Sequence, residues 1–350
     1  MLEGYSFLYI LLLFPVVSWG VLKYLNLADK RYYALLNFIL LSLTLGFRDI
    51  DMGTDTRVYL GAFEYNANVE ISSWTVGSFE WGYVILNKIL YFIGFPAQSI
   101  LVVISLFTIG IMIYVYYYYS DKMWLAIYLF IGLGLYTYSF NIIRQTLAAA
   151  IVMLAVCLLS DGKKLWFIFL VLAGAAFHQS VILFLPIVFL YNLTKWRIVG
   201  YIVACVSAVL SIYVSGLDNY LFLVENSKYI AYLGGQRLGE VNFGLGLLKV
   251  FFSVICGCIG IVMYYQNGKN NKLLIFSSLL VITAGVFDLM AYHIALIGRF
   301  SYNYFIYTTI LIPQLLKYSN LYKNLFYMYF FLIGVFIWFS KYLMVIEHYI

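Results

Sequence analysis

The stretch of sequence that decides the fold runs from residue 97 to residue 118 and reads AQSILVVISLFTIGIMIYVYYY. It carries no charged side chain. A helix needs about 20 mostly apolar residues to cross the hydrocarbon core of a bilayer, so this segment predicts a membrane-spanning helix. Its tyrosine-rich end is typical of the interface between lipid and water, and we prefer that interpretation to a nucleic-acid stacking platform.

Comparable apolar runs recur along the whole chain. The 350 residues are 65% hydrophobic and only 10% charged, with a mean hydropathy of +0.94. A soluble domain is nearer half apolar and a quarter charged, so this composition excludes one. We predict a single integral membrane domain over residues 1–350, all-α, with about a dozen transmembrane helices. The predicted helices lie at about 5–22, 32–47, 97–118, 123–140, 142–160, 165–177, 179–193, 198–216, 244–265, 273–292, 300–316 and 324–346.

Short basic loops fall at alternate positions along this series of helices. They hold more than half of the 21 Lys and Arg, namely Lys23, Lys30, Arg31, Lys122, Lys163, Lys164, Lys195, Arg197, Lys269, Lys272, Lys317 and Lys323. Of the 15 acidic residues they hold only Asp29, Asp121 and Asp161. The positive-inside rule makes these loops cytoplasmic and places both termini outside.

This alternation requires two choices. The segment from Trp81 to Phe95 is apolar but short, and it carries Asn87 and Lys88 at its middle. We interpret it as an interfacial or re-entrant helix that closes a large outer loop, residues 48–96. A second outer loop covers 217–243. The apolar segment 165–193 is divided at His178 into two short helices.

Polar side chains concentrate in five places on the predicted outer side. The first outer loop starts RDIDMGTDTRVY at residue 48 and ends FEWGY at residue 83. The other four places are Arg144-Gln145 at the start of a helix, His178 at a helix break, Arg299 with Tyr302, and the glycine-containing loop with Lys228 and Arg237. The simpler explanations are a solvated loop, a snorkelling arginine and a structural histidine.

Arginine suits phosphate binding because its planar fork donates paired hydrogen bonds and keeps its charge. We therefore expect Arg48, Arg144 and Arg299 to bind the diphosphate of a lipid-linked substrate. A carboxylate or imidazole would deprotonate an acceptor hydroxyl, and our ranking for this catalytic base is Asp55, then His178, then Glu80. Weaker substrate-binding candidates are Asp51, Tyr59, Gln145, Lys228, Arg237 and Tyr302.

The motifs resemble the EpsG-like branch of the Wzy-type polysaccharide polymerases of bacterial envelopes. The similar features are Arg48 with Gly53-Thr54-Asp55 and Tyr59, then Glu80-x-Gly82-Tyr83, Arg144-Gln145, His178-x-Ser180, and Arg299 with Tyr302. The resemblance implies a GT-C-like membrane glycosyltransferase in the bacterial inner (plasma) membrane. It would act at the periplasmic face on undecaprenyl-diphosphate-linked repeat units, moving the growing glycan from its lipid carrier to the non-reducing end of a new unit.

Enzymes of this kind are expected to use no metal and no cofactor. The sequence agrees, because Asp49-Ile50-Asp51 is only formally a DxD motif and the four cysteines lie inside apolar runs. Expected partners are the lipid-linked donor and acceptor glycans and membrane lipid, with a chain-length regulator as a candidate and no nucleic acid.

Alternative functions remain open at this point. A lipid-linked oligosaccharide flippase would share the substrate, although transporters place charge near the bilayer midplane and often show internal repeats. An O-antigen ligase would have a similar topology and a different acceptor. A membrane acyltransferase could use His178, but its acyl donor would usually be cytoplasmic.

Overall fold

The computed structural model describes residues 6–27, 29–71, 75–76, 79–193, 243–267, 271–291, 297–319 and 325–346. Internal contacts divide the chain into two compact units, Met1–Val188 with Leu321–Ile350, and Phe189–Asn320. We call these unit 1 and unit 2 and describe each by itself. The predicted helix 198–216 and the predicted loop 217–243, with Lys228 and Arg237, lie outside the described residues apart from Phe243.

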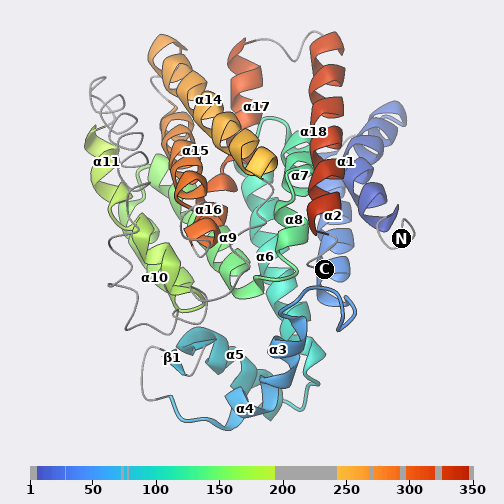
Figure 1. Ribbon diagram of the computed structural model, residues 1–350, viewed down its shortest axis with the longest axis vertical. Coiled ribbons are helices and arrows are strands. Elements are labelled where there is room, and N and C mark those ends of the chain that lie inside the picture. Colours follow the sequence, from blue (N-terminus) through green and yellow to red (C-terminus); the bar gives the residue numbers. More distant parts are fainter. Residues whose placement is uncertain are drawn as a thin grey trace. The chain divides into compact units, whose positions relative to one another are not determined.

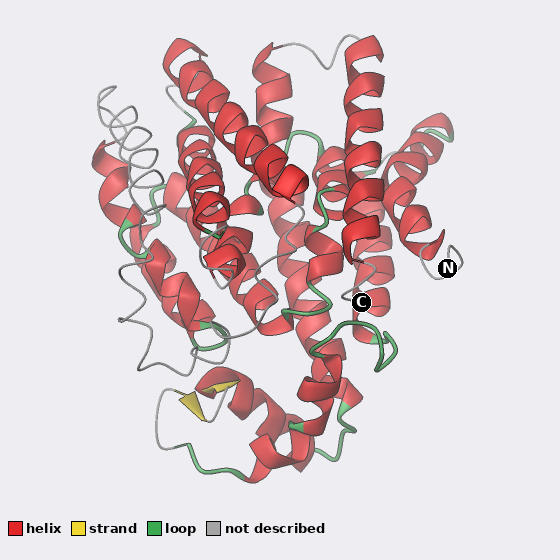
Figure 2. Cartoon of the chain, viewed as in Figure 1, coloured by secondary structure: helices red, strands yellow, loops and turns green. Residues whose placement is uncertain are grey.

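Helices dominate both units, and the described strands form one short pair beside α5 (Figure 2). Unit 1 contains α1 (Ser6–Tyr24), α2 (Lys30–Gly46), α3 (Thr56–Gly61), α4 (Phe63–Asn68), β1 (Thr75–Val76), β2 (Phe79–Glu80), α5 (Trp81–Phe92), α6 (Gln98–Tyr119), α7 (Met123–Gly132), α8 (Leu135–Tyr138), α9 (Ile143–Ser160), α10 (Lys164–Ala175), the 3-10 helix η1 (Gln179–Phe184) and α18 (Leu325–Ile346). Helix α11 (Ile187–Leu193) crosses the division, and unit 2 contains α14 (Phe243–Asn267), α15 (Lys272–Met290), α16 (Ile297–Phe305) and α17 (Thr308–Ser319).

Within the described residues, six helices are long and apolar enough to cross a membrane. They cover Ser6–Tyr24, Gln98–Tyr119, Ile143–Ser160, Leu245–Gln266, Lys272–Met290 and Phe326–Met344, and shorter apolar helices accompany them. The predicted all-α membrane class is confirmed. A total of about a dozen spans and the GT-C likeness stay predictions.

Three apolar segments that we predicted as single helices are each divided by a turn, and one of them, 179–193, is split between η1 and α11. In the segment 123–140, Gly134 adopts a φ of +79° and ends α7, and the Tyr342 hydroxyl donates to its carbonyl oxygen at 3.1 Å. In the segment 300–316, the Thr308 and Thr309 hydroxyls each donate at 2.7 Å to the backbone carbonyl three residues earlier. These bonds satisfy carbonyls at the turn between α16 and α17 that no longer take part in the helical ladder.

The predicted cytoplasmic loops of unit 1 lie together at one end of its helices. Lys30 at the start of α2 bonds to the backbone oxygen of Tyr117 at the end of α6. The hydroxyl of Tyr119 donates to Asp161, between α9 and α10, at 2.6 Å. Helix α18 runs parallel to α7, since Tyr128 bonds to Leu332 while Tyr342 bonds to Gly134. Three of the predicted basic loops, at 23–31, 120–122 and 161–164, thus gather at one end of unit 1, and which end faces outside stays a prediction.

The segment 48–96 gathers at the opposite end of these helices. Figure 1 shows α3, α4 and α5 together at the foot of unit 1, beside the start of α6. Their buried apolar residues form one cluster with the first turns of α6 and α9, including Tyr59, Phe63, Tyr83, Ile100 and Ile143. The predicted loop is thus a packed helical layer, and we call residues 48–96 the cap. Among the polar residues of the cap, Arg48, Thr56 and Glu80 are buried.

Candidate functional site

The entry to α5 approaches the break between α10 and η1. The Gly82 backbone N–H donates to the Ala176 carbonyl at 2.9 Å. A Cβ atom on Gly82 would lie 2.7 Å from the same carbonyl oxygen and 2.8 Å from the Ala176 Cβ. Real Cβ atoms do not come so close, so only glycine permits this approach. The contact brings Glu80, two residues before Gly82, beside His178, two residues after Ala176.

Glu80 is the centre of the site that results. Its carboxylate forms an ion pair with the Arg144 guanidinium, and its Oε1 lies 3.2 Å from the Nδ1 of His178. The Gln179 backbone N–H also points at Oε1, at 3.4 Å. The Glu80 side chain is only 5% exposed, against 16% for Arg144 and 27% for His178. The site is therefore a buried carboxylate held between a guanidinium and a half-buried imidazole.

The surroundings of Glu80 favour its charged form. Burial acts against ionisation and would raise the pKa of the carboxyl. The hydrogen bond from His178 and the charge of Arg144 outweigh burial, and the net pKa of Glu80 lies below its usual range. A carboxylate is hence present at neutral pH to orient both partners.

Aromatic rings surround the Arg144 guanidinium. Its central carbon lies 4.8 Å from the Phe79 ring centroid, 5.6 Å from that of Tyr83 and 5.9 Å from that of Tyr59. Phe79 and Tyr83 themselves stack at 5.1 Å. Ring faces attract a guanidinium and limit its side-chain motion. The rings and Glu80 together fix the position of the Arg144 head group.

Arg48 connects the cap to the helices. Its Nη1 donates to the Leu45 carbonyl at 2.6 Å, its Nη2 to the Phe140 carbonyl at 3.1 Å, and its Nε to the Thr56 hydroxyl at 3.1 Å. The residue is buried, at 5% exposure. Arg48 thus joins the end of α2, the start of α3 and the turn before α9.

The Gly53-Thr54-Asp55 motif contacts the turn that precedes α9. A Cβ atom on Gly53 would lie 2.7 Å from the Phe140 carbonyl oxygen, and the Thr54 backbone N–H donates to the Asn141 side chain at 2.7 Å. The Tyr59 hydroxyl donates to the Asn141 carbonyl at 3.2 Å. Asp55 lies at the start of α3, where its carboxylate is 3.4 Å from the Thr54 hydroxyl. The motif fixes the first turn of α9, which carries Arg144.

A comparison with protein families finds one family whose model matches most of the chain. The model of the EpsG family matches residues 31–349. This chain belongs to the EpsG family. The expected resemblance to EpsG-like proteins is confirmed by this match, which spans both units. No curated protein and no solved structure gives a match.

The EpsG-family chain therefore brings three predicted catalytic or binding residues into contact, Glu80, Arg144 and His178. Asp51 is exposed and pairs with Arg57, and Gln145 is buried in the first turn of α9. The role of each residue stays a prediction.

The fourth predicted cluster belongs to unit 2. Arg299 is exposed in the first turn of α16, and Tyr302 is buried on the same helix. The structure describes this helix without relating it to Arg48 and Arg144 in unit 1. A diphosphate site shared by the three arginines stays a prediction.

Sequence reasoning missed a partly buried ion pair in unit 2 of this EpsG-family protein. The Lys249 Nζ on α14 lies 2.8 Å from Asp288 Oδ1 on α15 and 3.2 Å from the Ser301 hydroxyl on α16. The sequence does contain an indication of this pair. Lys249 and Asp288 are each a single charged residue within an otherwise apolar predicted span. Such residues are rare in membrane helices and are normally paired or functional.

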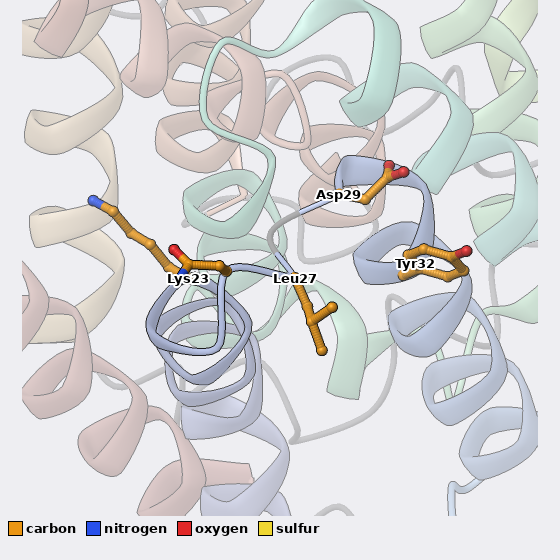
Figure 3. A pocket seen from close by; sticks show the side chains of 5 residues that line it. Lys23, Leu27, Asp29 and Tyr32 are labelled. Atoms are coloured by element: carbon orange, nitrogen blue, oxygen red, sulfur yellow. The ribbon is translucent and has the colours of Figure 1, made fainter.

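One cavity in the described part of unit 1 lies away from Glu80. It has a volume of about 510 Å³ and opens at the turn between α1 and α2, where Lys23, Asn26, Leu27, Asp29 and Tyr32 line it (Figure 3). The cavity and Arg48 lie at opposite ends of α2. This helix is about 24 Å long at 1.5 Å per residue, so it separates the cavity from Arg48. Within the described ranges, no group of three His, Cys, Asp or Glu side chains could hold a metal ion.

Proposed function

We propose that this chain is a membrane glycosyltransferase that polymerises oligosaccharide repeat units linked to undecaprenyl diphosphate. The growing glycan would pass from its lipid carrier to the non-reducing end of a new unit, at the periplasmic face of the bacterial inner membrane. EpsG-family membership and the apolar spans support the class. The observation that carries the proposal is the contact of Glu80 with both Arg144 and His178.

His178 is the catalytic base in this proposal, ahead of Asp55 and Glu80. The His178 Nδ1 lies 3.2 Å from the Glu80 carboxylate, and we assign the proton of a neutral His178 to this nitrogen, which leaves the basic lone pair on Nε2. When Nε2 takes the proton of the acceptor hydroxyl, the imidazolium that forms is stabilised by the Glu80 carboxylate. Glu80 therefore acts as a positioning residue.

Arg144 has the complementary task in the same step. The acceptor oxygen forms a bond to the anomeric carbon of the donor glycan, and the bond from that carbon to the diphosphate oxygen breaks. Negative charge grows on the departing lipid diphosphate. A guanidinium held in place before the reaction stabilises that charge without the cost of reorganisation. Arg299 remains a proposed second ligand of the diphosphate, and Arg48 supports Arg144 through the turn before α9.

The decisive experiment is elongation of purified lipid-linked repeat units by the purified protein, read as a ladder on a gel. Arg144→Ala and His178→Asn should leave single repeat units. Arg31→Ala is the matched control because Arg31 is exposed and pairs only locally with Asp29. Normal ladders from well-expressed Arg144→Ala protein would refute the proposal.

The two alternative functions give different products in the same setting. A flippase would change the side of the membrane on which single units accumulate and would form no ladder. A ligase would transfer chains to a different acceptor, and its loss would remove all attached chain rather than shorten it. A ladder made by the purified protein from one lipid-linked substrate excludes both.

A further inference from the structure

Three helices of unit 2 meet around a partly buried charge pair. Helices α14 and α15 pack along each other, and α16 packs on α15 (Figure 1). Lys249, Asp288 and Ser301 contribute one side chain from each helix, with Lys249 donating to both others. The Phe305 ring centroid lies 4.5 Å from the Lys249 ammonium. The three polar groups thus form one cluster, which we call the 249–288–301 cluster.

The cluster lies near one end of its helices rather than at their middle. Asp288 is two residues from the end of α15, or about 3 Å, and Lys249 is six residues from the start of α14, or about 9 Å. Ser301 is in the second turn of α16. The positive-inside pattern predicts that this end faces outside. A polar head group at the membrane surface can reach this depth, whereas a transport site would lie near the midplane.

One acceptor in the cluster is not satisfied. The Asp288 side chain is 10% exposed, and its Oδ1 accepts from Lys249. Its Oδ2 has no hydrogen-bond partner among the described residues and is covered by its neighbours, so a ligand contacts it only when those side chains move aside. Buried polar atoms are almost always paired, so an exception indicates a role. A carboxylate oxygen accepts from hydroxyl groups, and the Ser301 hydroxyl beside it both donates and accepts.

An ion pair kept only for packing is a poor explanation for this cluster. A buried ion pair costs desolvation energy, and apolar residues of similar size often replace it without loss of stability. The Lys249 ammonium, the half-satisfied Asp288 and Ser301 together match the alternating donors and acceptors of a sugar ring. Phe305 adds an aromatic side chain to the same place.

We propose that the 249–288–301 cluster is a saccharide-binding subsite, in which Asp288 accepts a hydrogen bond from a sugar hydroxyl. The inference rests on the proposed function for its ligand, a repeat unit of the lipid-linked glycan. It adds a recognition site in unit 2 to the reaction site of unit 1. It assigns Asp288 and Lys249 to specificity rather than to the transfer step.

The test uses the purified full-length protein in detergent. The probe is the oligosaccharide released by mild acid from the lipid-linked pool of a strain that lacks this protein. Binding is measured by saturation-transfer difference NMR, and elongation is measured separately as a ladder. The variants are Asp288→Asn, Lys249→Met with Asp288→Leu, and the control Thr283→Val, whose hydroxyl bonds within its own helix.

We expect Asp288→Asn and the double variant to remain monodisperse and to bind the probe about tenfold more weakly or worse, while Thr283→Val binds as wild type. The double variant decides the test if Asp288→Asn does not fold. Wild-type binding and elongation by either variant, or no binding of the probe to the wild-type protein, would overturn the proposal. If the wild type binds the probe in an Asp288-dependent way but elongates nothing, the subsite stands and the polymerase function fails.

Discussion

Glu80 and Arg144 are 64 residues apart in the sequence and form an ion pair at the junction of the cap and α9. The pair makes each residue depend on the other, because a buried charge without its partner is costly. It also ties the cap to α9. The first expectations follow from this dependence.

Glu80→Gln should abolish elongation and also reduce thermal stability in detergent. The variant keeps the shape of the side chain but leaves Arg144 charged and unpaired, at a cost of about 3 kcal/mol. Scanning fluorimetry of the purified protein measures the stability. The double variant Glu80→Gln with Arg144→Gln should recover much of that stability and still fail to elongate. Full activity of the double variant would contradict the site.

The Glu80 contribution to stability should depend on pH in the acid range. Its folded pKa is lower than the unfolded value of about 4.3, so the stabilisation is complete above that pH. It is lost as the pH falls through the folded pKa, because protonation then removes the charge that Arg144 and His178 bind. The stability difference between wild type and Glu80→Gln should be constant near neutral pH and shrink below about pH 4.3. A difference that grows on acidification would have the wrong sign.

Gly82→Ala should change the geometry of the site, although Gly82 does not itself contact Arg144 or His178 through a side chain. The added methyl group would overlap the Ala176 carbonyl, and separating the two segments would cost about 1–3 kcal/mol and move His178 away from Glu80. Elongation should fall at least about tenfold. Gly61→Ala is the control, because a Cβ atom there meets nothing within 4 Å. Equal activity of the two variants would show that the close approach is not needed.

Arg48→Lys should weaken the attachment of the cap. Lysine keeps the positive charge, but one ammonium cannot reach Leu45, Phe140 and Thr56 in the geometry of the guanidinium. We expect lower thermal stability and slower elongation, with Arg31→Lys as the exposed control. Unchanged stability would show that the three bonds are not needed to hold the cap.

The sidedness of the site can be tested by thiol labelling in whole cells. In a background without the four native cysteines, Arg57→Cys in the cap and Arg299→Cys in α16 should react with a membrane-impermeant reagent. Lys163→Cys, between α9 and α10, should react only after the membrane is permeabilised. Opposite accessibility of positions 57 and 299 would exclude a common diphosphate site for Arg144 and Arg299.

Much of this fold could be predicted because a helix that crosses a lipid bilayer needs about 20 mostly apolar residues in sequence. The run 97–118 was predicted as a helix, and α6 covers Gln98–Tyr119. The division of α7 from α8 could not be predicted in the same way, because the apolar pattern continues across it. The Tyr342 hydroxyl, which bonds to Gly134 at that break, lies 208 residues further along the chain.

The site could be predicted only in part for a related reason. Charge and helix ends identified Glu80, Arg144 and His178 as candidates, but their mutual contact depends on the approach of Gly82 to Ala176. The spacing of these residues in the sequence does not indicate that Gly82 and Ala176 come close in space. The Lys249–Asp288 pair was missed because each residue was considered within its own apolar span. The partner of each residue lies on the neighbouring helix.

The Gly82–Ala176 contact also has a consequence for engineering. Residues 79–82 and 176–179 come from distant parts of the chain but share one backbone hydrogen bond and one carboxylate. A chimera that takes only its cap from a relative would set foreign residues against the native 176–179 segment. Grafts intended to change glycan specificity should therefore exchange both segments together, so that the donor's own pairing is carried over intact.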